Sequence, residues 1–501
     1  MAKTSKKTEK KAPSEGREKF DLIVIGSGPA GIHAAIQSAK LGKKACVIEK
    51  RTDKLGGAWI HTGTLPSKTF RESLDAVQSI KHHVGHEWVE RVNQELQLKL
   101  FDRAKMVSAQ EQAVVKRNLE KNGVKIFTGY GYIENEFNVR VTPKDEDSFV
   151  ISGENILIAT GSRPRRPDNI PFDGWRVVDS DEILALERIP KSLIIYGAGV
   201  IGCEYACIFA ALGVKVTLVD ARTRMMQYMD LEITQTLEKA LEEMGIEVVL
   251  GRPLDRIDCE GPSAIFHSKD YSVEADMLFF AAGRVSNSDH LGLEKLGIEI
   301  VERGGAIVVN KSFQTNVSNV YAAGDVIGYP ALASTSKPQG RHVAMHAAGV
   351  RDLEFPEFFP VGVYTIPEMS MIGKTEEDCE KEGLDYVVGR ANYSEIARAY
   401  IGGDYNGKLK IILDRCTQKI LGIHIVGTDA CNLVHIGLTF MLQDGRAQDF
   451  INMVFNHPTL AEGYKIAAFN GLNRIFPSGK ILNPCDETEK ILKKRSNKKV
   501  A

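Results

Sequence analysis

The stretch Gly26-Ser27-Gly28-Pro29-Ala30-Gly31 follows a short apolar run, Phe20 to Ile25, and precedes small residues that predict a helix from Ile32 to Leu41. A second apolar run, Lys44 to Ile48, ends in Glu49. This order predicts a strand, a tight glycine turn, a helix and a second strand that ends in an acid. In such a unit the glycines let the backbone approach a pyrophosphate at the helix N-terminus, and the acid binds ribose hydroxyls. The sequence therefore predicts a dinucleotide site.

The same pattern occurs a second time. Gly197-Ala198-Gly199-Val200-Ile201-Gly202 follows a predicted strand, Ser192 to Tyr196, and precedes a predicted helix, Cys203 to Leu212. The next predicted strand, Val214 to Val219, ends in Asp220. Two complete fingerprints predict that one chain binds two dinucleotides. The alternative is a duplication that lost its second binding site, and the acid at the end of each second strand argues against it.

Length and spacing predict a multidomain α/β chain. With 501 residues, the chain is longer than one hydrophobic core usually supports. Asn155 to Pro164 and Asn319 to Asp325 are predicted as buried strands on either side of the second fingerprint. We therefore expect the second nucleotide domain to be inserted into the first. Past Phe355, predicted strands at Lys408 to Leu413 and Ile420 to Ile425 come before helices, which indicates a C-terminal α+β domain.

Composition argues against several classes of protein. The chain is 43% hydrophobic and 26% charged, with a formal net charge of −1, so neither nucleic acid nor a membrane is expected as a partner. No apolar run is long enough to span a bilayer. Only Cys203 and Cys207, of eight scattered cysteines, are close in sequence, and we expect small buried residues there rather than metal ligands. The scatter fits a reducing compartment, so we expect a cytoplasmic protein without a metal site.

Both ends of the chain are predicted as basic tails. Residues 1–19 are rich in lysine and lack the apolar stretch of a secretory signal, so a disordered tail is expected. Residues 479–501 contain the basic run Lys493 to Lys499, which is predicted to be solvated. The alternative for this run is a nuclear signal or a nucleic-acid patch.

From about residue 20 to residue 478, the chain resembles the two-dinucleotide flavoprotein family of lipoamide dehydrogenase and glutathione reductase. Besides the fingerprints, the matching motifs are Ala159-Thr160-Gly161-Ser162-Arg163-Pro164, Ala282-Gly283-Arg284 with Asn287, Gly324-Asp325, and His457-Pro458-Thr459 with Glu462. The resemblance implies two Rossmann-like domains and a C-terminal α+β dimerisation domain that forms a homodimer. The implied boundaries are 20–168 and 288–354 for the FAD-binding domain, 169–287 for the NAD(P)-binding domain and 355–478 for the dimerisation domain.

The resemblance also implies which residues hold the two nucleotides. The implied FAD contacts are Gly26, Gly28, Gly31, Glu49, Lys68, Gly131, Gly161, Asp325 and Ala333. The implied contacts of the nicotinamide nucleotide are Gly197, Gly199, Gly202, Asp220 and Gly283. Lys68 and Glu204 would pair near the reactive edge of the flavin, where the lysine would stabilise negative charge. A buried structural ion pair is the alternative.

One segment departs from the pattern of the family. Its disulfide reductases read G-G-x-C-x-x-x-x-C-x-P-S-K, whereas here Trp59 and Thr64 stand at the two cysteine positions. Neither side chain can be reduced, so electrons on the flavin must pass to an external acceptor. This segment, Gly324 to Pro330 and Ala467 to Arg474 are most similar to the soluble pyridine nucleotide transhydrogenases within the family.

That similarity implies hydride transfer between NADPH and NAD through FAD: NADPH reduces the flavin, NADP leaves, and NAD takes the hydride, with the reverse equally allowed. One site must then accept both nucleotides. Asp220 suits NAD, because a carboxylate binds ribose hydroxyls and repels a 2′-phosphate. Arg222 and Arg224 come shortly after Asp220 in the sequence. Two roles are possible for them: they bind the 2′-phosphate, or they are simply solvated.

Three further alternatives stay open at this point. His457 and Glu462 are catalytic candidates because this pair serves the dithiol in disulfide-using relatives, but with no thiol here a structural or interface role is favoured. The enzyme could instead be an NAD(P)H dehydrogenase that reduces quinones, which requires an open pocket near Trp59. It could also be a flavoprotein redox sensor, in which reduction changes assembly or partner binding.

Overall fold

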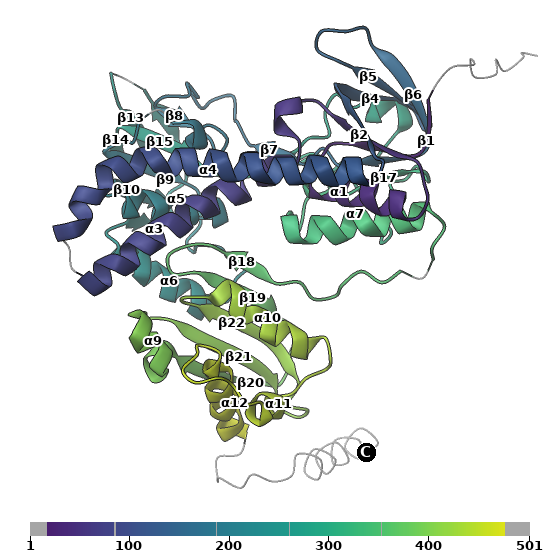
Figure 1. Cartoon of the computed structure of the whole chain (residues 1–501). Helices are drawn as coiled ribbons and strands as arrows, with labels where there is room; N and C mark the ends of the chain where they lie inside the picture. Colours follow the sequence, from purple (N-terminus) through teal and green to yellow (C-terminus); the bar gives the residue numbers. More distant parts are fainter. Residues whose placement is uncertain (1–17, 85–86, 187, 260, 352, 476–501) are drawn as a thin grey trace, which may run out of the picture. The chain divides into compact units, whose positions relative to one another are not determined.

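The computed structural model describes residues 18–84, 87–186, 188–259, 261–351 and 353–475 (Figure 1). It divides into two compact units. The first unit comprises the described residues up to His61, Ala109–Arg163 and Arg284–Phe355. The second unit comprises Thr62–Ser108, Pro164–Gly283 and the described residues from Pro356 onward. Apart from Glu18 and Lys19, the predicted tails 1–19 and 479–501 lie outside the described residues.

The first unit is built on a seven-stranded sheet in the order β3-β2-β1-β6-β5-β4, with β17 paired to β6. β1, β2, β3, β6 and β17 run parallel, and β4 and β5 extend the sheet antiparallel from β6. The central strands β1 and β2 are largely apolar and buried, as expected of strands covered on both faces. The strands are β1 (Lys19–Ile25), β2 (Ala45–Glu49), β3 (Lys125–Thr128), β4 (Tyr130–Asn135), β5 (Asn138–Thr142), β6 (Phe149–Ile158) and β17 (Val320–Ala322).

Two helices of the first unit, α1 (Pro29–Lys40) and α7 (Ala333–Ala347), lie side by side (Figure 1). Their close approach needs glycine at residue 340, because a Cβ atom at Gly340 would lie 2.0 Å from the carbonyl oxygen of Ala30. The smaller elements are η1 (Thr52–Lys54), α2 (Ala58–His61), β7 (Ser162–Pro164), β16 (Arg284–Ser286), η3 (Leu293–Leu296) and η4 (Asp325–Ile327).

Both fingerprint helices begin three residues before the predicted starts, Ile32 and Cys203. In α1 the N-cap is Gly28 and in α5 (Val200–Ala211) it is Gly199, and both caps have extended backbone. Pro29 occupies the first helical position of α1, where its fixed φ suits the helix and its missing N–H costs nothing. The last glycine of each fingerprint therefore lies inside the first helical turn rather than before it.

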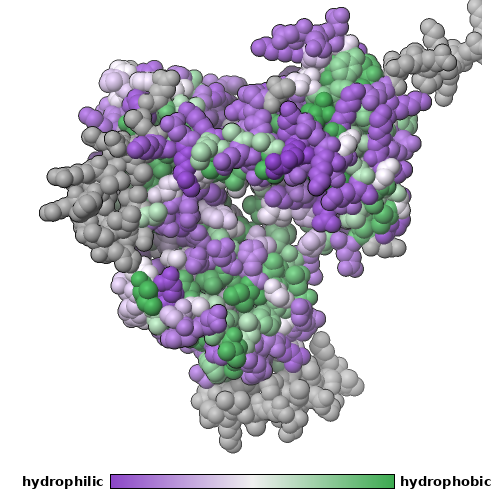
Figure 2. All heavy atoms as spheres, viewed as in Figure 1, coloured by the Kyte–Doolittle hydropathy of each residue, from purple (hydrophilic) through white to green (hydrophobic). Residues whose placement is uncertain are grey.

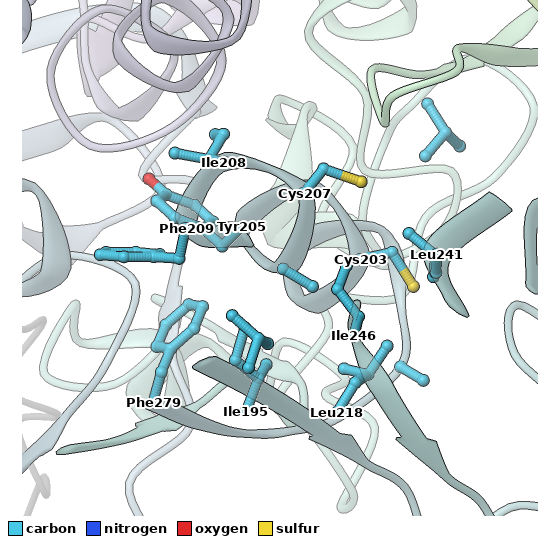
Figure 3. Packing of buried hydrophobic residues seen from close by; sticks show 14 of the residues in the cluster. Ile195, Cys203, Tyr205, Cys207, Ile208, Phe209, Leu218, Leu241, Ile246 and Phe279 are labelled. Atoms are coloured by element: carbon cyan, nitrogen blue, oxygen red, sulfur yellow. The ribbon is translucent and has the colours of Figure 1, made fainter. Parts of the chain in front are cut away.

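The second unit contains a parallel sheet in the order β11-β10-β9-β15-β8, which places the second fingerprint in the same strand–turn–helix setting as the first. Helix α5 rests on this sheet, where Phe209 lies near Phe279 and Cys203 lies near Leu241 and Ile246 (Figure 3). The elements are β8 (Val177–Val178), η2 (Ile183–Ala185), β9 (Ser192–Tyr196), β10 (Lys215–Val219), α6 (Leu231–Glu243), β11 (Glu247–Val249) and β15 (Met277–Phe280), with an antiparallel sheet of β12 (Arg256–Asp258), β13 (Ala264–Ser268) and β14 (Tyr271–Ala275).

Helix α3 (Thr64–Val84) belongs to the second unit, as does the first part of α4 (Glu87–Lys121), although both fall within the sequence-predicted FAD-binding range 20–168. The cause is apolar packing. Phe70 and Leu100 share a buried cluster with Tyr205 and Ile208 of α5. Packing against the second fingerprint helix thus places residues 62–108 in the second unit. The functional boundaries given above, 20–168 for the FAD-binding domain among them, stay a prediction.

The C-terminal part of the second unit is an antiparallel sheet in the order β18-β19-β22-β21-β20, flanked by helices. Its strands are β18 (Val361–Val363), β19 (Met369–Gly373), β20 (Tyr386–Asn392), β21 (Lys408–Asp414) and β22 (Ile420–Val426). Its helices are α8 (Glu376–Lys381), η5 (Tyr393–Glu395), α9 (Ala397–Gly402), α10 (Ala430–Met441), α11 (Ala447–Asn452) and α12 (Glu462–Ile475). The predicted α+β character is confirmed. Within the described part of the chain, no helix combines the length and apolar character needed to cross a membrane.

A buried lysine joins this domain to the nucleotide domain of the same unit. Lys410, whose side chain is 1% exposed, lies 2.8 Å from both carboxylate oxygens of Asp230 and 3.3 Å from Glu232, and it also pairs with Glu376. Asp230 is the N-cap of α6. Burial raises the pKa of Glu232, but hydrogen bonds from Lys408 and Arg390 outweigh burial and bring it down to about 2. The start of α6 is thus fixed to β21 by paired charges.

Replacing this lysine should destabilise the second unit strongly. Lys410→Met leaves the buried Asp230 carboxylate without its cation, and breaking a buried ion pair in this way costs about 3–5 kcal/mol. Lys419→Met is the matched control, because Lys419 pairs with Asp444 at the surface, where such a pair contributes about 0–1 kcal/mol. Denaturant unfolding of both variants measures the difference. Equal midpoints for the two variants would contradict a stabilising role for Lys410.

Candidate functional site: two dinucleotide turns

The glycines of the first fingerprint differ in what surrounds them. Gly26 has a φ of +105°, and a Cβ atom there would lie 2.3 Å from the carbonyl oxygen of Ala159. A Cβ atom at Gly31 would lie 2.1 Å from the carbonyl oxygen of Gly26. At Gly28 a Cβ atom would meet only the Ala159 oxygen, at 3.9 Å. The first and third glycines are therefore fixed by packing, while the second leaves the N-terminus of α1 open to a phosphate.

Glu49 holds this turn from the end of β2. Its Oε2 atom accepts hydrogen bonds from the Ser27 backbone N–H at 3.2 Å and from the Ser27 hydroxyl at 2.6 Å. Its Oε1 atom accepts the N–H of Arg51 at 3.1 Å. The Ser27 oxygen also accepts the N–H of Gly56 at 2.9 Å. Sequence reasoning did not single out Ser27, because it stands at a variable position of the fingerprint.

Gly131, Gly161 and Asp325 lie at the carboxyl ends of the parallel strands of the first unit, the edge where such sheets bind ligands. Gly161 follows β6 with a φ of +71° and no atom within 4 Å of a Cβ position. Asp325 follows β17 and accepts the Ser162 hydroxyl at 2.8 Å. Ala333 is the first residue of α7. Gly131, in β4, faces the side chain of Ile25 at the end of β1.

The second fingerprint repeats this arrangement. Gly197 has a φ of +118°, and a Cβ atom there would lie 2.7 Å from the Ala281 oxygen. A Cβ atom at Gly202 would lie 1.8 Å from the Gly197 oxygen. At Gly199 and Gly283 nothing lies within 4 Å of a Cβ position. The backbone at these two open glycines fits the close approach of a second dinucleotide.

Asp220 and Arg222 form a closed pair beside this turn. Asp220 Oδ2 accepts the Ala198 N–H at 2.6 Å and Arg222 Nη2 at 2.7 Å, and Oδ1 accepts Arg222 Nε at 2.9 Å. Burial raises the pKa of Asp220, but these hydrogen bonds outweigh burial and the net pKa is lowered. The Asp220 side chain is 5% exposed and that of Arg222 is 44% exposed. The Arg222 side chain is therefore partly exposed to solvent while it pairs with the acid that ends β10.

Arg224 lies apart from this pair. Its Nη1 atom is 2.7 Å from Glu377 Oε1 in α8, and its Nη2 atom donates to the Met229 carbonyl oxygen. Its Nε atom donates to the hydroxyl of Thr234 at 3.3 Å. Of the two arginines that the sequence offered for a 2′-phosphate, the structure brings Arg222 to Asp220 and directs Arg224 to the C-terminal domain.

Lys68 and Glu204 pair within the second unit. Lys68 Nζ lies 2.5 Å from Glu204 Oε2, and the Glu204 side chain is 4% exposed. The other oxygen of Glu204 accepts the Tyr364 N–H at 2.9 Å, and the Tyr364 ring centroid lies 4.9 Å from Lys68 Nζ. The pair joins α3 to α5, and Tyr364 orients both partners. Tyr364 lies in no motif, so sequence reasoning did not single it out.

His457 and Glu462 form a pair of their own in the C-terminal domain. His457 Nδ1 lies 3.1 Å from both oxygens of Glu462, and the His457 side chain is 69% exposed. Glu462 also accepts the Thr459 N–H at 3.2 Å. Among the described residues of this chain, no hydrogen bond or ion pair connects His457 to Lys68 or Glu204. The arrangement therefore leaves the second ring nitrogen of His457 exposed on the surface of this chain.

The cysteines within the described ranges are all free thiols; Cys485 lies outside these ranges. Cys203 and Cys207 are buried on α5, as expected, and burial raises the pKa of Cys207 to about 12. Such thiols are poor nucleophiles at neutral pH. Among the residues that the structure describes, no cluster of His, Cys, Asp and Glu could hold a metal ion.

Trp59 stands on α2 in the first unit, at one of the two family cysteine positions. Lys337 Nζ of α7 lies 4.8 Å from the centroid of its ring. The indole N–H is buried and has no acceptor among the described residues. The other cysteine position, Thr64, begins α3 in the second unit. Lys337 had no signal in the sequence, because its partner lies far away along the chain.

Comparison with known proteins agrees with this architecture. The family model "Pyridine nucleotide-disulphide oxidoreductase" matches residues 20–346, and the model of the dimerisation domain of that family matches residues 359–468. The soluble pyridine nucleotide transhydrogenase of Photorhabdus laumondii subsp. laumondii is 41% identical over 462 residues, covering 91% of this chain and 99% of that protein. The protein of the same name from Mycobacterium bovis is 40% identical over 459 residues, covering 91% and 98%.

Solved structures share the fold of this chain. A Cu(II) complex of the HOCl-induced flavoprotein disulfide reductase RclA from Escherichia coli has a TM-score of 0.82 and 27% identity, covering 90% of this chain and 99% of that chain. LpdA from Mycobacterium tuberculosis has a TM-score of 0.82 and 25% identity, with the same coverage. With two fingerprint turns of matching geometry and family models over both parts of its length, the chain belongs to the pyridine nucleotide-disulphide oxidoreductase family.

Proposed function

We propose that this chain is an FAD-dependent transhydrogenase that moves a hydride between NADPH and NAD⁺ in two half-reactions at one nicotinamide-nucleotide site. The observation that carries the proposal is the combination of two open dinucleotide turns, at Gly28 and Gly199, with a segment that offers no thiol at Trp59 or Thr64. Relatives that span nearly the whole chain bear the name soluble pyridine nucleotide transhydrogenase, which supports it.

The first unit suits FAD. Its open turn at Gly28 would receive the pyrophosphate, Glu49 the ribose hydroxyls, and Asp325 the ribityl and pyrophosphate region, with the remaining contacts at Gly26, Gly31, Gly131, Gly161 and Ala333. When bound, FAD supplies the two-electron chemistry that accepts a hydride from one nicotinamide and returns it to another. Glu49 already orders the turn through Ser27, so the site is held in shape by the protein itself.

The second unit would hold the nicotinamide nucleotides on Gly197, Gly199, Gly202 and Gly283, with Asp220 and Arg222 at the adenosine ribose. Asp220 would accept the hydroxyls of NAD(H). Arg222 would donate to the 2′-phosphate of NADP(H), because its guanidinium is partly exposed while it pairs with Asp220. Arg224 is the weaker candidate, since Glu377 and Met229 occupy its donors.

Lys68 is proposed to stabilise negative charge on the reduced flavin, as the family resemblance implies, with Glu204 and Tyr364 holding its ammonium group in place. Because Glu204 is buried and bonded on both oxygens, the ammonium is held in a preorganised position. His457 and Glu462 are given an interface or structural role. No described cysteine that they could serve lies at the family positions.

We propose a homodimer through the C-terminal domain, acting in the cytoplasm. The dimerisation model matches this domain. Hydrophobic residues show among hydrophilic ones on its visible surface in Figure 2, and Leu442, Val454 and Phe469 are exposed. Such residues are what a subunit interface would cover.

The central test is direct transfer between nucleotides. Purified protein carrying FAD should reduce thio-NAD⁺ at the expense of NADPH, with parallel double-reciprocal plots because one product leaves before the second substrate binds. Lipoamide and glutathione disulfide should turn over far more slowly. Absorbance at the thio-NADH band follows the reaction. Faster reduction of a disulfide or a quinone than of thio-NAD⁺ would refute the proposal.

Lys68→Met should slow flavin reduction by NADPH more than it weakens FAD binding. Removing a preorganised charge at a developing anion costs about 10²–10³ in rate. Stopped-flow bleaching of the flavin measures the rate, and flavin retained after gel filtration measures binding. Lys374→Met, which removes an exposed pair with Glu382, is the control. An unchanged bleaching rate in Lys68→Met would leave the lysine a purely structural role.

Changes at Asp220 and Arg222 should give opposite nucleotide preferences. Arg222→Ala should raise KM for NADPH with little change for NADH, because each charge-assisted contact to the 2′-phosphate contributes about 1.5–3 kcal/mol, less where exposed. Asp220→Asn should weaken NADH and spare NADPH. Arg224→Ala should change KM for NADPH less than Arg222→Ala does.

Steady-state kinetics with each nucleotide decide between these outcomes. Arg415→Ala, which removes an exposed pair with Asp385, is the control for loss of an arginine. If Arg222→Ala impairs NADH and NADPH equally, the residue is not the 2′-phosphate contact, and selection between the two nucleotides lies elsewhere in the site.

A further inference from the structure

The residues just before Trp59 contact the turn of the first fingerprint. The N–H of Gly56 donates to the Ser27 hydroxyl at 2.9 Å, which anchors the residues just before α2 to that turn. A Cβ atom at Gly57 would lie 3.0 Å from the Gly28 Cα atom, so the two backbones touch. Gly28 is the glycine that leaves space for a phosphate. Trp59 is therefore two residues away from the backbone that borders the proposed FAD site.

The partner of Trp59 comes from a second element at the same site. Lys337 lies on α7, four residues after Ala333, a proposed FAD contact. Its ammonium is 4.8 Å from the centroid of the Trp59 ring, and a cation over an indole face is attracted by the electron density of the ring. Helix α7 is itself fixed, because Gln339 accepts the Gly324 N–H at 2.8 Å. Both members of the pair therefore stand on anchored backbone.

The indole N–H of Trp59 has no partner within the described part of the protein, although the atom is buried. Buried donors are nearly always hydrogen-bonded, because an unmade bond carries the cost of lost hydration. The unpaired N–H is thus a donor that an acceptor outside the chain could satisfy. FAD carries several nitrogen and oxygen acceptors, and its proposed site borders α2.

We propose that Trp59 and Lys337 form a pair that determines which electron acceptors the reduced cofactor can meet. The indole donates its N–H to FAD and covers the side where disulfide-using relatives carry cysteines, and Lys337 positions the ring. Nicotinamide nucleotides then remain the acceptors with access. This inference rests on the proposed function and deepens it, because it names a residue pair that would keep quinones away from a flavin without a disulfide.

The reaction that the pair would exclude needs NADPH as its only reductant. NADPH, a proton and a quinone give NADP⁺ and a hydroquinone. A planar quinone must reach the flavin to accept the two electrons. We expect the indole, a large side chain that follows anchored backbone, to obstruct that approach. Loss of the ring should open the enzyme to quinones without adding any catalytic group.

A fluorescence measurement tests the contact without turnover. An indole against a flavin quenches the fluorescence of the flavin, so Trp59→Phe should raise the fluorescence yield of bound FAD in the resting protein. Trp175→Phe is the matched control, because Trp175 lies in the second unit under its own cation, with the Arg188 guanidinium 4.3 Å from its ring. Its replacement should leave the flavin fluorescence unchanged.

Acceptor selection is tested with Trp59→Ala. The ratio of menadione reduction to thio-NAD⁺ reduction should rise about tenfold or more, the scale on which a pocket contact discriminates substrates. Trp59→Leu serves if the alanine variant does not retain FAD. Lys337→Met should raise both the flavin fluorescence and the menadione ratio, and Lys337→Arg, which keeps a cation over the ring, should restore them.

Two results would overturn the proposal: unchanged flavin fluorescence in Trp59→Phe, or an unchanged acceptor ratio in a Trp59 variant that retains FAD. Failure of the proposed function looks different. If the unmodified protein does not reduce thio-NAD⁺, the proposed transhydrogenase activity is wrong. The flavin fluorescence of Trp59→Phe and Trp175→Phe still decides whether Trp59 contacts FAD.

Discussion

The fold depends on one steric constraint: two glycines must lack side chains so that a helix can begin directly against its strand. A Cβ atom at Gly31 or Gly202 would lie far inside van der Waals contact with a carbonyl oxygen, at 2.1 and 1.8 Å. Because these contacts leave no room for any other residue, the helix N-terminus is held against the turn, and its free N–H groups face outward. Each nucleotide site is a consequence of that contact.

A second feature, an acid that holds the glycine turn, also occurs in both units. In each unit, the acid that ends the second strand accepts a backbone N–H of the glycine turn, Glu49 from Ser27 and Asp220 from Ala198. The acid therefore has a structural task before any ribose arrives. The two sites differ in what else the acid holds. Glu49 is bonded to a serine and the backbone, whereas Asp220 also carries the guanidinium of Arg222. The proposed function assigns a resident cofactor to the first site and exchanging nucleotides to the second.

Sequence periodicity predicted the strands well because apolar runs bounded by glycine leave little freedom. The first fingerprint strand was expected from Phe20 to Ile25 and is found at Lys19–Ile25. Helix starts were wrong by three residues, since the sequence pattern does not reveal which glycine caps the helix. The pairing of Lys68 with Glu204 was implied by resemblance and is present at 2.5 Å, while its effect on flavin stays a proposal.

Contacts between segments that are far apart along the chain could not be predicted from the sequence. Tyr364 and Lys337 reach their partners only after the chain has folded back, and neither lies in a motif. The grouping of α3 with the second fingerprint helix is of the same kind, because it results from apolar packing around Phe70 rather than from any local pattern. Arg224 is the clearest example, because its partner Glu377 lies in the C-terminal domain, far away along the chain.

The Asp220–Arg222 pair also bears on how one site could serve two nucleotides in turn. A 2′-phosphate that binds Arg222 must share a guanidinium already bonded to a carboxylate, and ribose hydroxyls that bind Asp220 must share a carboxylate already bonded to a guanidinium. Neither nucleotide gains the full energy of a fresh charged contact, because part of it is present in the free protein. Two-step exchange at one site needs each product to leave before the next substrate enters. A site with its charges partly neutralised in advance favours that release, whereas a free arginine would hold NADP⁺ and slow the second half-reaction.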